Sequence, residues 1–223
     1  MTGELQTLEI HTGAQPAWSV IWLHGLGADG HDFEPIVAEL DLPAPVRFVF
    51  PHAPVRPITV NGGYPMRAWY DIVSFERGGP EDEAGVRASA RQIERLIAVE
   101  AARGTPAARV VLAGFSQGGA MALHTALRYP QPLAGIIALS AYLPLPALLA
   151  AERSAVTEPV PIFMAHGRDD PTVPEAFGAR SRDTLRSAGC EVQWRTYPMG
   201  HTVCPQEVSD ISAWLRARLQ QPA

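Results

Sequence analysis

One serine lies in a short pattern of residues that can make its hydroxyl group a nucleophile. Ser116 is the centre of the sequence GFSQG, which follows an apolar run at 109–113 and precedes a segment, 117–129, with a helical pattern. A sharp turn between a strand and a helix exposes such a serine, and the glycines relieve crowding in the turn. The pattern predicts that Ser116 attacks a carbonyl carbon. The alternatives are a glycine-rich phosphate-type turn and a chance match.

The base that such a serine requires is expected at His201. A serine hydroxyl is a weak nucleophile until a neighbouring base removes its proton. Among the seven histidines, His201 is the one that follows the last expected strand, late in the chain. The chain order serine, acid, histidine is one of those found in catalytic triads. The alternative is a histidine at the surface or at the edge of the core.

The acid is expected in the sequence HGRDDPTVP, directly after an apolar run at 161–165. A carboxylate there would fix the tautomer of the histidine and stabilise its cation. Asp170 is preferred because Pro171 restrains the backbone of the loop, and Asp169 is the alternative.

The negative charge that develops on the attacked carbonyl oxygen needs preorganised hydrogen-bond donors. One is expected from the backbone N–H of Gln117, the residue after the serine. The other is expected from the N–H of Leu26, in the loop HGLG that follows an apolar run at 19–23. Glycines let the backbone turn tightly beside a site. The alternative is a glycine turn that only ends a strand. A mechanism through these groups requires no metal and no organic cofactor.

The composition excludes several other classes of function. The formal net charge is −5, which gives no basic surface for nucleic acid and no polybasic membrane patch. All 18 positively charged residues are arginine. The absence of lysine excludes Schiff-base enzymes, pyridoxal enzymes and Walker-type phosphate loops, because these need a lysine amine.

The pattern of apolar segments predicts an α/β fold. Apolar runs that are buried on both faces alternate with amphipathic segments, so a mostly parallel sheet flanked by helices on both faces is expected, in one domain over 1–223. In such sheets ligands bind beyond the carboxyl ends of the strands. Strands are expected at 19–23, 46–50, 109–113, 135–140, 161–165 and 191–197, and helices at 81–103, 117–129, 174–188 and 205–219. Two segments rich in proline or glycine, 51–68 and 142–161, are expected to be long functional loops.

The compartment is expected to be the cytoplasm. The first ten residues lack the basic start and apolar run of a signal peptide, and no apolar run approaches the length of a membrane span. Cys190 and Cys204 are expected to be thiols, with a single disulfide bridge as the alternative.

At the residues singled out above, the sequence resembles a known family. The segments HGLGADGHDF, NGGYPMRAWYD, GFSQGGAMAL and HGRDDPTVP and the late glycine–histidine pair at 200–201 resemble acyl-protein thioesterases and small bacterial carboxylesterases, the phospholipase/carboxylesterase family. The resemblance covers roughly residues 19–219. It implies an α/β-hydrolase fold without a large separate lid. It also places Ser116, Asp170 and His201 at the triad positions and Leu26 and Gln117 at the oxyanion donors.

The resemblance implies a carboxylic ester hydrolase that acts on short- to medium-chain acyl esters through an acyl-enzyme. The alternatives within the family are an acyl-protein thioesterase and a lysophospholipase. Members are cytosolic and several are homodimers, so a homodimer is left open here. Outside the family's chemistry, the alternatives are a binding protein without turnover, a peptidase and an acyltransferase.

The acyl chain of such a substrate needs an apolar groove. Candidates come from the two proline- or glycine-rich segments, although a tryptophan beside a reacting centre can equally belong to the core. The candidate substrate-binding residues are Tyr64, Met66, Trp69, Leu143 and Leu145, with Leu148 as a further candidate.

Overall fold

A seven-stranded sheet forms the centre of the protein. The computed structural model describes residues 4–74, 79–154 and 160–220. The strand order is β1-β3-β2-β6-β7-β8-β9, with β1 antiparallel to β3 and all other neighbours parallel. The strands are β1 (Thr7–His11), β2 (Trp18–Leu23), β3 (Val46–Pro51), β6 (Val110–Phe115), β7 (Gly135–Leu139), β8 (Ile162–Gly167) and β9 (Val192–Tyr197). The prediction of a mostly parallel sheet is confirmed.

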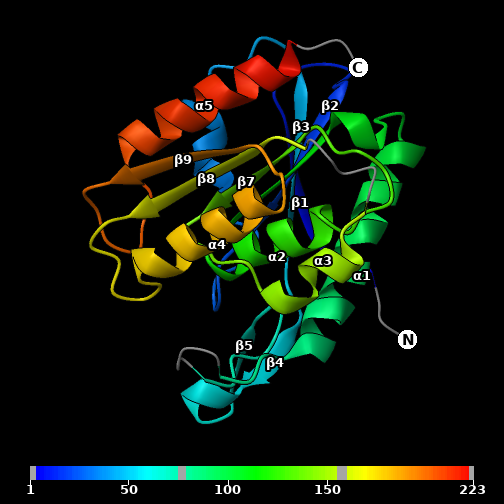
Figure 1. The fold of residues 1–223 in the computed structure, drawn as a ribbon. Coiled ribbons are helices and arrows are strands. Elements are labelled where there is room, and N and C mark those ends of the chain that lie inside the picture. The colour runs from blue at the N-terminus through cyan, green and yellow to red at the C-terminus, as the bar shows by residue number, and fades with distance from the viewer. Residues whose placement is uncertain (1–3, 75–78, 155–159, 221–223) are drawn as a thin grey trace.

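Helices cover both faces of this sheet (Figure 1). Successive side chains of a strand point to opposite faces, so Ile21 and Leu23 join one apolar cluster while Val20 and Trp22 join another. The first cluster includes side chains from α1 (Glu83–Ala102), α2 (Gln117–Ala126), α3 (Leu149–Glu152) and α4 (Glu175–Ser187). The second cluster includes side chains from α5 (Pro205–Leu219) and the 3₁₀ helix η1 (Glu34–Glu39). The predicted helices on both faces are thus confirmed.

The segment at 51–68 differs from the expected irregular loop. It contains a two-stranded antiparallel hairpin, β4 (Val55–Ile58) and β5 (Tyr64–Arg67), which projects from the sheet at the bottom of Figure 1. A short 3₁₀ helix, η2 (Thr59–Asn61), and two glycines with positive φ, Gly62 at 65° and Gly63 at 79°, make the turn.

The segment at 142–161 also has local structure. It contains the 3₁₀ helix η4 (Pro146–Leu148) and then α3, while 155–159 lies outside the described residues. One further 3₁₀ helix among the described residues, η3 (Ala107–Arg109), leads into β6. Within the described ranges, no helix is long and apolar enough to cross a membrane.

Cys190 and Cys204 are thiols, so the single bridge that the sequence left open is not formed.

The first turn of α2 packs so closely on the end of β2 that residue 118 has to be glycine. A Cβ atom at Gly118 would overlap the carbonyl oxygen of Leu23. We expect Gly118→Ala to lower the free energy of unfolding by about 3 kcal/mol, because overpacking forces backbone shifts. Urea denaturation measures the loss.

Gly200→Ala is the matched control for this prediction. A Cβ atom at Gly200 would come no closer than 3.8 Å to its neighbours, the nearest being a ring carbon of Pro171. Its free energy of unfolding should stay within about 1 kcal/mol of the original protein. Equal losses in the two variants would show that close packing is not the cause.

Candidate active site

Ser116 lies at the junction of β6 and α2, in a backbone conformation that is rare for a residue with a side chain. Its φ is 54° and its ψ is −121°. Its N–H donates to the carbonyl oxygen of Leu139 over 2.8 Å, which fixes the turn against β7. Such strain persists only where the surroundings impose it, and it is common at functional sites. The turn between strand and helix is the context that the sequence pattern requires.

His201 and Asp170 lie in line with Ser116. The Nε2 atom of His201 is 3.0 Å from the Oγ atom of Ser116, and its Nδ1 atom is 2.7 Å from the Oδ2 atom of Asp170. The Asp170 side chain is fully buried and that of His201 is 17% exposed. Because a carboxylate can only accept, Nδ1 carries the proton and Nε2 is left to take the serine proton. Asp169, the alternative acid, is exposed to solvent.

The Asp170 carboxylate is held by its own loop. Its Oδ1 atom accepts hydrogen bonds from the N–H groups of Thr172 and Val173 at 2.9 and 2.8 Å, which leaves Oδ2 for His201. His166 braces the same loop, since its Nε2 atom donates to the carbonyl oxygen of Val173 over 2.8 Å. Burial lowers the pKa of His166, which keeps the ring neutral beside the carboxylate.

The loop with Leu26 approaches the serine because residue 25 is glycine. A Cβ atom at Gly25 would lie 3.5 Å from the Cβ atom of Ser116, so the backbone of this loop runs directly beside the nucleophile position. The N–H groups of Leu26 and Gln117 donate to no backbone carbonyl of a described residue. Gln117 is also the first residue of α2, where the helix dipole favours negative charge. Both N–H groups are therefore available to an oxyanion.

The side chain of Gln117 has a structural role that the sequence did not reveal. Its Oε1 atom accepts from the backbone N–H of Trp69 and its Nε2 atom donates to the carbonyl oxygen of Tyr70, both over 2.8 Å. The indole Nε1 of Trp69 in turn donates to the carbonyl oxygen of His24 over 2.9 Å. These three bonds connect the start of α2 to the loop that contains Leu26.

His24 completes this connection from inside the loop. Its Nε2 atom accepts the N–H of Ala53 over 3.0 Å, and its Nδ1 atom donates to the carbonyl oxygen of Gly25 over 2.7 Å. Burial lowers the pKa of His24 to about 4, so the ring is neutral and can serve as both donor and acceptor. The sequence pattern identified the loop but gave no sign of this anchoring, because its partners are distant in the chain.

The hairpin candidates for substrate contact differ in exposure. Tyr64 is 67% exposed at the start of β5. Met66 is half-buried, and its sulfur would lie 3.7 Å from a Cβ atom at Gly27, which places it beside the loop of Leu26. Substrate contact by either residue stays a prediction.

The remaining candidates are buried. Trp69 is 0% exposed, and its indole already supports the loop of His24. Leu143 and Leu145 are 4% and 8% exposed and belong to the same apolar cluster as Trp69. For these three residues, substrate contact would require a neighbouring side chain to move, and it too stays a prediction.

The loop of His201 leads into α5, whose first turn buries a carboxyl group. Glu207 is 0% exposed, and burial raises its pKa to about 8, which the nearby N–H of Cys204 only partly opposes. An unfolded glutamic acid ionises near its ordinary pKa of 4.5. The folded state therefore holds an extra proton between about pH 4.5 and 8, and stability falls as the pH rises through this window.

We expect Glu207→Gln to remove this part of the pH dependence. At pH 8 the variant should be more stable than the original protein by up to about 4 kcal/mol, whereas at pH 4.5 the two should be similar. Urea denaturation between these pH values measures the difference. Glu39→Gln, at an exposed position, is the control and should follow the original protein. A constant difference between Glu207→Gln and the original protein at every pH would contradict the prediction.

Comparison with known proteins agrees with this geometry. A family model described as Phospholipase/Carboxylesterase matches residues 5–219. The chain belongs to this family. The family likeness that the sequence motifs predicted is thus confirmed, and the protein is an enzyme, a serine hydrolase with the α/β-hydrolase fold.

Several members of the family are similar to this chain over nearly its whole length. Acyl-protein thioesterase 1 of Mycosarcoma maydis is 39% identical, with 95% of this chain and 96% of the relative covered. Acyl-protein thioesterase 1 of Neurospora crassa is 42% identical, with 92% and 88% covered. The crystal structure of Zea mays acyl-protein thioesterase 2 superposes with a TM-score of 0.86 at 30% identity, and covers 96% of this chain and 99% of that one.

Proposed function

We propose that the protein is an acyl-protein thioesterase, which hydrolyses the thioester between an acyl group and a cysteine side chain of a protein. The similar relatives named above carry this name and are covered almost completely. They favour this alternative over the ester hydrolase that was the first expectation from the sequence. Hydrolysis of short- to medium-chain oxygen esters is the second candidate, because the same arrangement of serine, histidine and aspartate serves both substrates.

The observation that carries the acyl-transfer chemistry, which both candidates share, is the alignment of Ser116, His201 and Asp170 through distances of 3.0 and 2.7 Å. In the first step, the Ser116 oxygen bonds to the thioester carbon while its proton passes to Nε2 of His201. The carbonyl oxygen becomes an oxyanion that accepts from the N–H groups of Leu26 and Gln117. Asp170 stabilises the imidazolium.

The carbon–sulfur bond then breaks, and the proton on His201 goes to the departing cysteine thiol. A cysteine thiol has an ordinary pKa of about 8.5, so sulfur leaves more readily than an alkoxide does. Water next attacks the acyl-serine ester, again giving its proton to His201, and the carbon–oxygen bond to Ser116 breaks as the serine regains a proton. The products are a carboxylic acid, a free cysteine and the original enzyme.

A pair of peptides tests the choice of substrate. One peptide carries an acyl group on a cysteine sulfur, and the other carries the same acyl group on a serine oxygen in the same sequence. We expect kcat/KM to be higher for the sulfur peptide by more than the ratio of the two peptides' uncatalysed hydrolysis rates. A ratio equal to or below the uncatalysed one would favour the general esterase. A series of acyl chain lengths completes the comparison.

Covalent labelling separates an enzyme site from a binding site at this position. A fluorophosphonate reacts with an activated serine, and peptide mapping by mass spectrometry should place the label on Ser116. A label on a different residue would overturn the assignment of the nucleophile while leaving the family membership intact. The cytoplasmic location and the homodimer also remain predictions, and light scattering in solution tests the second.

A further inference from the structure

His24 is a buried histidine of the HGLG loop that the proposed chemistry does not use. The residue is 1% exposed, so it is out of reach of a substrate. Its ring lies 5.3 Å from that of Trp69, measured between centroids, and both ring nitrogens are hydrogen-bonded to backbone groups. The ring therefore fixes the direction of two peptide groups as well as filling space.

The N–H of Ala53 selects the tautomer of this ring. An amide N–H can only donate, so the Nε2 atom of His24, 3.0 Å away, has to be the nitrogen without a proton. Burial lowers the pKa of His24 to about 4, so the ring is neutral and its one proton is on Nδ1. Nδ1 therefore donates to the carbonyl oxygen of Gly25 over 2.7 Å.

The carbonyl group of Gly25 belongs to the same peptide unit as the N–H of Leu26. A peptide unit is planar and trans, so its C=O and N–H groups point in opposite directions. A donor that holds the Gly25 oxygen on the side of the His24 ring therefore turns the Leu26 N–H away from the ring. Because glycine leaves the backbone more freedom to rotate than any other residue, this orientation needs a restraint from outside.

The loop passes directly beside the nucleophile. A Cβ atom at Gly25 would lie 3.5 Å from the Cβ atom of Ser116. Just beyond Leu26, the N–H of Gly27 donates to the carbonyl oxygen of Arg67 over 2.9 Å, which holds the loop a second time. The Leu26 N–H lies between these restraints and donates to no backbone carbonyl of a described residue.

We propose that His24 is a positioning residue for the reaction, whose Nδ1–H holds the peptide unit between Gly25 and Leu26 so that the Leu26 N–H points to the oxyanion. Stabilisation of an oxyanion depends on donors that are oriented before the reaction begins. The inference rests on the acyl-transfer chemistry of the proposed function, which esters and thioesters share. The N–H of Ala28 also donates to the Gly25 oxygen, at 3.3 Å, so loss of the His24 bond should loosen the donor without removing it.

Two substitutions separate the two nitrogens of the ring. His24→Asn can keep a donor near the place of Nδ1, but it leaves the Ala53 N–H without an acceptor. His24→Gln can keep an acceptor near the place of Nε2, but it leaves the Gly25 oxygen with the Ala28 bond alone. We expect the kcat of His24→Gln to fall about ten- to hundredfold with KM unchanged, which is less than the loss of a whole oxyanion donor. The loss of kcat in His24→Asn should be smaller.

The stability of the two variants should follow the opposite order. Ala53 is 0% exposed, so His24→Asn leaves a buried N–H without a partner and should have the lower melting temperature. The less stable variant would then be the more active one, which a merely structural role of His24 does not produce. An unchanged kcat in His24→Gln, or a kcat order that follows the melting temperatures, would overturn the proposal.

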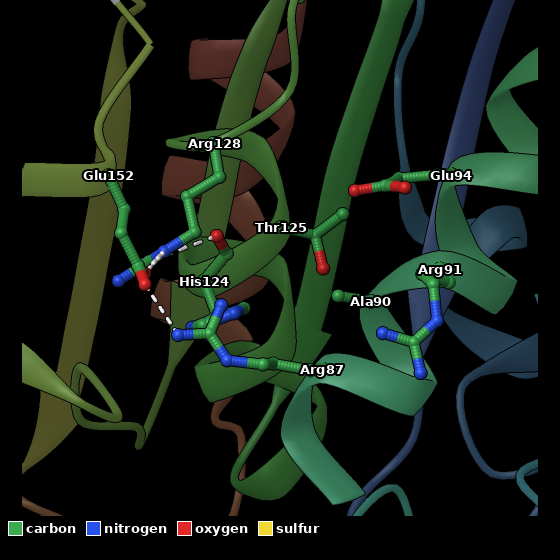
Figure 2. A pocket seen from close by; sticks show the side chains of 8 residues that line it. All are labelled: Arg87, Ala90, Arg91, Glu94, His124, Thr125, Arg128 and Glu152. Carbon is green, nitrogen blue, oxygen red and sulfur yellow. Dashed lines mark hydrogen bonds and ion pairs between the residues drawn. The ribbon is translucent and has the colours of Figure 1, made fainter. Parts of the chain in front are cut away.

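His124→Gln is the matched control. His124 is also 1% exposed, and burial lowers its pKa to about 4 as well. It lies roughly 12 Å along α2 from Ser116 at the rise of an α-helix, at a hollow that Arg128 and Glu152 also line (Figure 2). Its kcat should stay within a few-fold of the original protein. A loss as large as that in His24→Gln would show that any buried histidine has this effect, which would overturn the proposal.

A trifluoromethyl ketone tests the oxyanion donor itself. The Ser116 oxygen bonds to the ketone carbon, its proton passes to Nε2 of His201, and the ketone oxygen becomes an oxyanion that resembles the transition state. The inhibition constant should rise in His24→Gln by the same factor by which kcat falls. An inhibition constant that stays the same while kcat falls would contradict a role in orienting the donor.

Two further measurements keep the test independent of folding and of the substrate. Nuclear magnetic resonance of the original protein, labelled with ¹⁵N in histidine, should show His24 as the Nδ1–H tautomer near neutral pH, and the Nε2–H tautomer would overturn the proposal. A p-nitrophenyl ester and an S-acyl peptide form the same oxyanion, so both should rank the variants alike. If the original protein cleaves only the ester, the thioesterase is refuted, and the ester series still decides the role of His24.

Discussion

Ser116→Ala should reduce kcat by about a million-fold, because triad residues act as a unit and the loss of the nucleophile removes their combined effect. A residual rate of up to about a thousand- to ten-thousand-fold above water should persist, since the oxyanion donors and substrate binding are untouched. Single-turnover kinetics with an S-acyl peptide measures this loss. Labelling by a fluorophosphonate should disappear in the same variant.

Ser140→Ala is the matched control for this prediction. Ser140 is also a serine with positive φ, 47°, and it follows the neighbouring strand β7. It has no contact with His201 or Asp170 among the hydrogen bonds of the described residues. Its kcat should stay within a few-fold of the original protein. A large loss of kcat in Ser140→Ala, with kcat retained in Ser116→Ala, would show that Ser116 is not the nucleophile.

Asp170→Asn should lower kcat by about ten-thousand-fold while the fold is kept. The equivalent change in a well-studied serine protease, where the geometry stays intact, has an effect of this size. An amide group at this position presents either a donor or a weaker acceptor to Nδ1 of His201, so the ring no longer holds its proton on that side. Nε2 is then protonated and cannot accept the proton of Ser116. Comparison of kcat and melting temperature separates this effect from unfolding.

Asp169→Asn is the control that this loop offers. Asp169 was the alternative acid from the sequence, and it is adjacent, exposed and of the same type. Its replacement should change kcat less than about tenfold, within the range of surface substitutions that touch no reacting group. A greater loss in Asp169→Asn than in Asp170→Asn would exchange the two assignments.

The strands of the parallel sheet could be predicted because burial on both faces leaves a clear signal. The run that became β6 is apolar almost throughout, and its ends were predicted within two residues. β1 was missed because it is an edge strand in which polar residues alternate with Leu8 and Ile10, over only five residues. The hairpin of β4 and β5 was missed because Pro57 and Pro65 interrupt it, and proline usually argues against a strand.

The candidate site was partly predictable because chain order and loop position restrict the choice of residues. Ser116, Asp170 and His201 each follow a strand of the parallel sheet, and the carboxyl ends of such strands meet at one edge. The supporting contacts could not be predicted. The bond between the Gln117 side chain and the backbone of Trp69 spans 48 residues, and nothing in either local sequence indicates the other.

The wide spacing of the three site residues has a consequence for how activity appears during folding. Ser116 and His201 are 85 residues apart, and His201 reaches its place only when β9, the last strand, pairs with β8. Contacts between distant parts of a chain form late, because the intervening loop must close first. Reactivity toward a fluorophosphonate should therefore arise after most of the secondary structure during refolding. A chain that ends before β9 would therefore have an unreactive Ser116, even with most of the sheet already formed.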